Sequence, residues 1–77
     1  MQIKIYTTPF CKHCHVARDF FHSRNISFVE VDVTQDQTAL EEMMKKSHQM
    51  GVPVVDINGS VLVGFNRAKI EELLKVT

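Results

Sequence analysis

The sequence has few cysteines, no excess of either charge and no long apolar run. It contains two cysteines in 77 residues, and both lie in one Cys-x-x-Cys segment. A disulfide that closes so short a loop removes little entropy from the unfolded chain, so it would add little to the stability of the fold. Reactivity or metal binding therefore explains the pair better than a structural bridge does.

Charge and hydropathy exclude two classes of partner. Nine Lys and Arg balance nine Asp and Glu, and no basic run is present, so nucleic acid is not an expected partner. No apolar stretch approaches the ~20 residues that span a bilayer, and the opening Met-Gln-Ile-Lys-Ile is too short and too charged for a secretory segment. We therefore expect a cytoplasmic protein with no membrane partner. No linker or repeat is visible, so residues 1–77 are expected to form one domain, and nothing demands more than a monomer.

The apolar pattern predicts seven elements in an α/β arrangement. Alternation predicts strands at residues 2–6, 27–33, 52–57 and 60–63. Spacing of three and four predicts helices over residues 12–23, from a cap at Thr34 or Asp36 to about residue 50, and from a cap at Asn66 to near the end. Asn58-Gly59 is a hairpin signal. The predicted order is β-α-β-α-β-β-α, a mixed four-stranded sheet with three helices whose first two strands are parallel.

The first cysteine is placed where a thiolate is favoured. Cys11 precedes the predicted helix directly, and the free amides of a helix N-terminus carry partial positive charge. Lys12 and a partly protonated His13 add positive potential. Because the thiolate is the nucleophile in thiol chemistry, Cys11 is the predicted catalytic nucleophile.

The second cysteine lies one helical turn further on the same face. Cys14 belongs to the apolar stripe of the predicted helix, so we expect it to lie deeper than Cys11. A bridge across this turn needs local strain, and strain makes a disulfide easier to reduce. We therefore expect Cys11 to attack a substrate disulfide and Cys14 to resolve the mixed disulfide.

These motifs resemble those of the glutaredoxin family, in the thioredoxin superfamily, from end to end. The resemblance rests on Cys11-Lys12-His13-Cys14 between the first strand and the first helix, and on Val52-Pro53 at a later strand. It implies the thioredoxin fold and a dithiol–disulfide oxidoreductase with no tightly bound cofactor. It further implies that Pro53 is cis beside the reactive cysteine and that the backbone of Val52 pairs with the substrate.

The chain departs from the commonest glutaredoxin pattern around its cysteines. Lys12-His13 stand where Pro-Tyr is frequent, and no lysine stands just before the motif, at residues 7–10. Val63-Gly64-Phe65 is similar to the Ser-Gly-Phe of glutaredoxin-like hydrogen donors of ribonucleotide reductase, which take electrons from thioredoxin reductase. The implied electron donor is therefore glutathione or thioredoxin reductase, and the implied substrates are protein disulfides, including that of ribonucleotide reductase. The predicted substrate-binding residues are Phe10, Lys12, His13, Val52, Pro53, Gly64, Phe65 and Asn66.

Two other uses of the cysteines remain open on the residues alone. Cys11 to His15 also spells Cys-x-x-Cys-His, the attachment signature of c-type haem, although the valine-rich strands do not fit a largely helical cytochrome. The cysteines and four histidines contain enough ligand types for zinc, but their spacing lacks a second regular pair, and an iron–sulfur cluster shared by two chains is a further alternative. We expect no metal ligand. Met43 and Met44 are expected in the core, and Arg18 is expected to be a surface charge.

Overall fold

The computed structural model describes residues 2–76 and has the predicted order of elements. The strands form one four-stranded sheet in the order β2-β1-β3-β4. β1 pairs with β2 in parallel and with β3 in antiparallel orientation, and β3 pairs with β4 in antiparallel orientation. In chain order the elements are β1 (Ile3–Thr7), α1 (Lys12–Ser23), β2 (Val29–Asp32), α2 (Gln37–Ser47), β3 (Val54–Ile57), β4 (Ser60–Val63) and α3 (Arg67–Val76).

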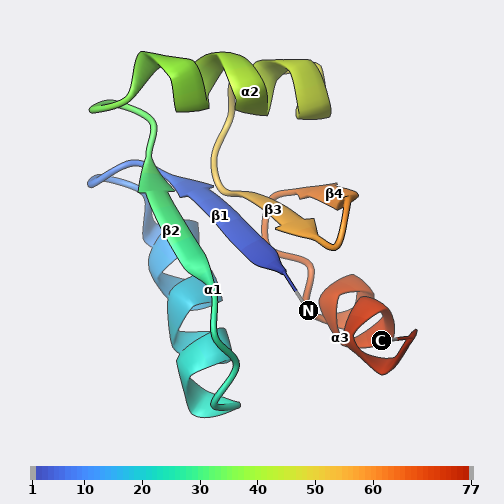
Figure 1. Ribbon diagram of the computed structural model, residues 1–77. Helices are drawn as coiled ribbons and strands as arrows, with labels where there is room; N and C mark the ends of the chain where they lie inside the picture. Colours follow the sequence, from blue (N-terminus) through green and yellow to red (C-terminus); the bar gives the residue numbers. More distant parts are fainter. Residues whose placement is uncertain (1, 77) are drawn as a thin grey trace.

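Helices cover both faces of the sheet, with α1 and α3 on one side and α2 on the other (Figure 1). Side chains alternate along β1, so Ile3 and Ile5 face α1 and α3 while Tyr6 faces α2. Two apolar cores result. The first contains Ile3, Ile5, Ala17, Phe20, Phe21, Val55, Ile57 and Ile70, and the second contains Tyr6, Val33, Ala39, Met43 and Val54. The predicted thioredoxin-type architecture is confirmed.

Side-chain caps fix where α2 and α3 begin. The Asp36 carboxylate accepts a hydrogen bond from the Ala39 N–H at 3.1 Å, so Asp36 and not Thr34 is the cap of α2. The Asn66 side chain likewise accepts from the Lys69 N–H at 3.1 Å, as predicted. Thr34 instead donates both its N–H and its hydroxyl to Asp32.

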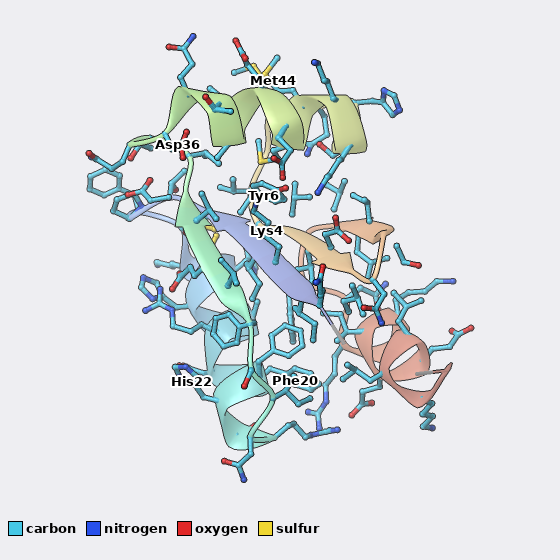
Figure 2. The ribbon with its side chains drawn as sticks, in the orientation of Figure 1. Lys4, Tyr6, Phe20, His22, Asp36 and Met44 are labelled. Atoms are coloured by element: carbon cyan, nitrogen blue, oxygen red, sulfur yellow. The ribbon has the colours of Figure 1, made fainter. Side chains whose placement is uncertain are left out.

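Several predicted boundaries and one predicted core residue are wrong. α2 ends at Ser47, short of residue 50, because His48 takes a left-handed conformation with φ of 59°. β2 is shorter at both ends than residues 27–33, and β3 begins only at Val54. Met44 points away from the sheet and is 38% exposed, whereas Met43 is buried as predicted. Met44 is labelled on the outer side of α2 in Figure 2.

Five polar side chains link the sheet to α2, and we call them the charged network: Lys4, Tyr6, Glu42, Lys46 and Asp56. Lys46 Nζ donates to Asp56 Oδ2 at 2.7 Å and to the Tyr6 hydroxyl at 3.0 Å. Glu42 accepts from Lys4 Nζ at 2.8 Å and from the Tyr6 hydroxyl. Tyr6 itself is fully buried between the sheet and α2 (Figure 2). Every member therefore has a partner of complementary chemistry.

The network shifts the protonation of its members. The hydrogen bond from Lys4, followed by that from Tyr6, lowers the pKa of Glu42 to about 2. The hydrogen bond to Asp56 is the largest cause that raises the pKa of Lys46. Burial raises the pKa of Tyr6. At neutral pH the Glu42 carboxylate and the Lys46 ammonium are therefore both charged.

Candidate functional site

The two cysteines lie where β1 passes into α1. Cys11 is the N-cap of α1, with extended backbone angles of φ −93° and ψ 112°, and its N–H donates to the Thr8 carbonyl at 3.4 Å. α1 begins at Lys12, as the apolar spacing predicts. The loop thus presents a half-buried cysteine thiol at the start of a helix.

The Cys11 sulfur takes the place that an oxygen takes in a serine or aspartate cap. The N–H of Cys14 donates to Cys11 Sγ at 3.1 Å. The sulfur therefore accepts a hydrogen bond from one of the helix amides that have no partner within the helix. The sulfur thus lies at the amino-terminal end of the helix, where the free amides carry partial positive charge.

Cys14 has the opposite environment. Its side chain is fully buried, and both thiols are free. Burial raises the pKa of the Cys14 thiol to about 12, and its hydrogen bond with the Cys11 side chain adds to the rise. At neutral pH Cys14 therefore holds its proton. The expectation that Cys14 lies deeper than Cys11 is confirmed.

The sheet register brings the other motifs to the same end of the sheet as the cysteines. Tyr6 of β1 pairs with Val54 of β3, and Val54 pairs with Val63 of β4. The residues just beyond these pairs are Thr7, Pro53 and Gly64. The Gly64 N–H donates to the Pro53 carbonyl at 2.7 Å, which extends the β3–β4 ladder by one step. We call this end of the sheet, with the β1–α1 loop, the cysteine end.

The proline that precedes β3 has the conformation that the resemblance implies. The Val52-Pro53 peptide bond is cis, Val52 is half-buried and Pro53 is buried. Gly64 has a φ of +81°, a conformation in which side chains other than glycine are strained. Both features lie at the cysteine end.

The remaining predicted site residues divide into two groups. Phe10, Lys12 and His13 are exposed around Cys11, and Phe10 is 92% exposed. Phe65 instead packs edge-on against Phe20 in the core, with ring centroids 5.7 Å apart, and Asn66 is the cap of α3. Folding alone therefore accounts for the contacts of Phe65 and Asn66, whereas it gives no reason for the exposure of Phe10.

The sequence reasoning missed an ion pair near Cys14. Arg18 of α1 lies 3.1 Å from Glu30 of β2, and both side chains are 32% exposed, so Arg18 is a surface charge with a partner on the sheet. Arg18 follows Cys14 by one helical turn, and the negative charge of Glu30 is one of the causes that raise the pKa of Cys14. The four-residue spacing from Cys14 was the signal that could have pointed to Arg18.

The metal alternatives find little support. Within residues 2–76, no three His, Cys, Asp or Glu side chains come together as a metal site would require.

Among the same residues, no helix has the length and apolar character to cross a membrane.

Comparisons with known proteins agree on one family. Residues 3–62 match the family model described as Glutaredoxin. An uncharacterized glutaredoxin-like 8.6 kDa protein in the rubredoxin operon of Clostridium pasteurianum is 47% identical over 73 residues, which cover 95% of this chain and 97% of that protein. Glutaredoxin 3 of Escherichia coli (strain K12) is 32% identical over 80 residues, covering 95% of this chain and 96% of that protein.

A solved structure extends the likeness to the whole fold. The glutaredoxin-like protein NrdH-redoxin from Escherichia coli, described as having a thioredoxin-like activity profile, superposes with a TM-score of 0.85 at 27% identity. The superposition covers 95% of each chain. This family does not favour the zinc or haem alternatives. With its cysteines at a helix start and its cis proline before β3, the chain belongs to the glutaredoxin family of thiol–disulfide oxidoreductases.

Proposed function

We propose that this chain reduces protein disulfides by a two-cysteine mechanism in which Cys11 is the nucleophile and Cys14 resolves. The Cys11 thiolate attacks one sulfur of the substrate disulfide, forms a mixed disulfide and displaces the other substrate sulfur as a thiolate. The Cys14 thiolate, after loss of its proton, attacks Cys11 Sγ and displaces the second substrate sulfur. The substrate gains two electrons, and the chain leaves with a Cys11–Cys14 disulfide.

The difference in burial between the two thiols is the observation that carries this assignment of roles. Cys11 is half-buried and accepts an amide hydrogen bond, whereas Cys14 is fully buried and its pKa is raised to about 12. A partly accessible sulfur can meet a substrate first, while a protonated, buried thiol does not compete for it. The reverse assignment would require a substrate to reach a sulfur with no exposed surface.

The substrate groove is proposed to lie at the cysteine end. Pro53 and Gly64 are joined by a hydrogen bond there, and Val52 precedes the proline with a half-buried side chain. An extended substrate segment could pair with the backbone of Val52, as the family resemblance implies. The other proposed contributors are Phe10, Lys12, His13, Phe65 and Asn66, of which the last two act chiefly by holding the start of α3.

The exposure of Phe10 favours a protein over a tripeptide as substrate. A phenyl ring that is 92% exposed next to the nucleophile offers apolar area that a polypeptide partner can cover. Glutathione offers little apolar surface in return. Ribonucleotide reductase is the candidate protein substrate, because Val63-Gly64-Phe65 is similar to the motif of its glutaredoxin-like hydrogen donors.

Trapping tests the roles of the cysteines and identifies the substrate. Cys14→Ser should accumulate a mixed disulfide between Cys11 and its partner in cell extract, which mass spectrometry of the captured protein would name. The matched control is the double variant Cys11→Ser, Cys14→Ser, which should capture nothing. Capture through Cys14 in a Cys11→Ser variant, or no capture by Cys14→Ser, would contradict the proposal.

The electron donor is tested by two coupled assays. We propose that thioredoxin reductase with NADPH sustains turnover better than glutathione with glutathione reductase, on the likeness to NrdH-redoxin. Faster turnover with glutathione would overturn that choice and leave the cysteine roles intact. Blocking Cys11 with iodoacetamide should stop turnover with either donor. We further propose that the chain acts in the cytoplasm as a monomer and holds no tightly bound cofactor.

A further inference from the structure

The Arg18–Glu30 pair stands out because its geometry joins the helix of the cysteines to an edge strand beside Cys14. Glu30 pairs with Ile5 across the parallel β1–β2 ladder, and Ile5 faces α1. Residues paired in a parallel ladder point to the same face of the sheet, so Glu30 also faces α1. Its ion pair of 3.1 Å with Arg18 agrees with this placement.

Arg18 is partly withdrawn from solvent toward the protein interior. Its Nε atom is buried and has no hydrogen-bond partner within residues 2–76. An N–H that is desolvated without a partner costs free energy, which a guanidinium lying freely on the surface would avoid. The positive charge of Arg18 thus lies on the inward side of α1, one turn from Cys14.

The ionisable groups that act on Cys14 besides the pair include the Cys11 side chain, whose hydrogen bond and electrostatic interaction both raise the pKa of Cys14. On β2, Asp32 lies two residues beyond Glu30 on the same face of the sheet, and its Oδ1 accepts hydrogen bonds from the N–H and the hydroxyl of Thr34. Toward α1, β3 contributes the apolar Val55 and Ile57, and the Thr8 backbone from the β1–α1 loop lowers the pKa of Cys14. Ile70 is the buried residue of α3 that joins the core under α1. The ionisable side chains of α1 near its start are exposed: Lys12, His13 and His15.

We propose that Arg18 and Glu30 are positioning residues for the resolving step, opposing each other in setting the charge beside the Cys14 thiol and hence the rate at which Cys14 attacks the mixed disulfide. This inference rests on the proposed function, since it requires Cys14 to resolve. The Glu30 carboxylate disfavours a second negative charge, and the Arg18 guanidinium favours it. Burial and the hydrogen bond with Cys11 keep Cys14 protonated in the reduced chain, and the two opposite charges of the pair adjust how readily that proton is lost once a mixed disulfide has formed on Cys11.

The reaction with Ellman's reagent separates the two steps. Attack by Cys11 releases one thionitrobenzoate and leaves a mixed disulfide, and attack by Cys14 releases the second. In stopped-flow absorbance these appear as a first and a second phase, and the first phase is an internal control for Cys11. Glu30→Gln should accelerate the second phase about 3- to 10-fold near neutral pH, and Arg18→Gln should slow it by a similar factor.

The opposite signs distinguish a charge effect from a structural one. If the pair only holds α1 against β2, both variants lose the same contact and shift the second phase in the same direction. Arg18→Lys should restore the rate to within about 2-fold of wild type because it restores the charge. The second phase of Glu30→Gln should also reach its maximum at lower pH than that of wild type.

A second ion pair, just beyond the other end of α1, supplies the matched control. Arg24, just past the end of α1, pairs with Glu71 of α3, far along the helix from Cys14. Arg24→Gln and Glu71→Gln should leave both phases unchanged. Shifts of the same sign in Glu30→Gln and Arg18→Gln, or no shift in either, would overturn the inference while two normal phases in wild type leave the proposed function standing. Absence of the second phase in wild type would instead contradict the proposed function.

Discussion

The cysteine end and the charged network treat polar groups in opposite ways. In the network, every charged or hydroxyl group has a partner, and Lys46 alone makes three hydrogen bonds. At the cysteine end, Cys11 accepts one hydrogen bond from an amide, and Phe10 lies in solvent with 92% of its surface exposed. Satisfied groups stabilise the fold, while groups left with spare bonding capacity are available to a substrate. Substitutions at the cysteine end should therefore lower turnover with little effect on stability, and substitutions in the charged network should do the reverse.

The largest difference between the loss of turnover and the loss of stability is expected for Cys11→Ser. Turnover should fall more than about a thousandfold, because serine has no thiolate to offer. The free energy of unfolding should change by less than about 0.5 kcal/mol, since a serine oxygen can accept the same helix amide. Activity assays and urea unfolding of the one variant measure both quantities. Retained turnover would show that Cys11 is not the nucleophile.

The converse variant is Lys46→Met. It leaves the Asp56 carboxylate, which is only 13% exposed, without its cation, and we expect a loss of about 2 kcal/mol in the free energy of unfolding. Turnover per folded molecule should stay at the wild-type level. Lys45→Met, at an exposed neighbouring position, is the control and should have little effect on stability. Equal losses of unfolding free energy in Lys46→Met and Lys45→Met would contradict a stabilising role for the charged network.

The same substitution, glycine to alanine, can be compared at the cysteine end and far from it. Gly64 and Gly59 have φ of +81° and +93°, and a Cβ at either would meet no atom within 4 Å. Gly64→Ala and Gly59→Ala should therefore each cost about 1.5 kcal/mol of stability through backbone strain alone. Turnover with a protein disulfide should fall only in Gly64→Ala, because Gly59 lies in the β3–β4 hairpin turn away from the cysteines. Similar turnover in both variants would exclude Gly64 from the groove.

The smallest effect concerns acid stability. The pKa of Glu42 is lowered to about 2 in the folded chain from 4.5, so its contribution is present above pH 4.5 and is lost as the pH falls toward 2. Because the side chain is 38% exposed, solvent screening reduces that contribution to about 1 kcal/mol. Urea unfolding at several pH values should show this component in wild type and in Glu41→Gln but not in Glu42→Gln. An unchanged acid profile in Glu42→Gln would contradict it.

Local patterns in the sequence predict most of the fold. α1 has the predicted bounds because its cap and apolar stripe are both local signals. The prediction for Met44 is wrong because Ala39, Leu40 and Met43 already fill the stripe of α2 that faces the sheet, and Met44 is turned about 100° from Met43. β2 is shorter than predicted because its ladder with β1 covers only Val29–Asp32, opposite residues 4–7.

The candidate site is predictable only where one segment holds it. The two cysteines share a helical turn, so their relation follows from spacing. The cis bond at Pro53 was implied by the family resemblance and not by its local sequence. The Arg18–Glu30 pair and the charged network join residues that are distant in the chain, and only the packing of helices on the sheet brings them together.

The buried Tyr6 also has a practical consequence for spectroscopy. It is the one tyrosine in a chain without tryptophan, and its hydroxyl hydrogen-bonds to Glu42 and Lys46. The ultraviolet emission of the protein therefore comes from a single phenol whose fluorescence is quenched by a carboxylate acceptor. Unfolding should brighten that emission. Oxidation of the cysteines, on the other side of the sheet, should leave the Tyr6 fluorescence nearly constant. The fluorescence therefore reports on folding independently of redox state.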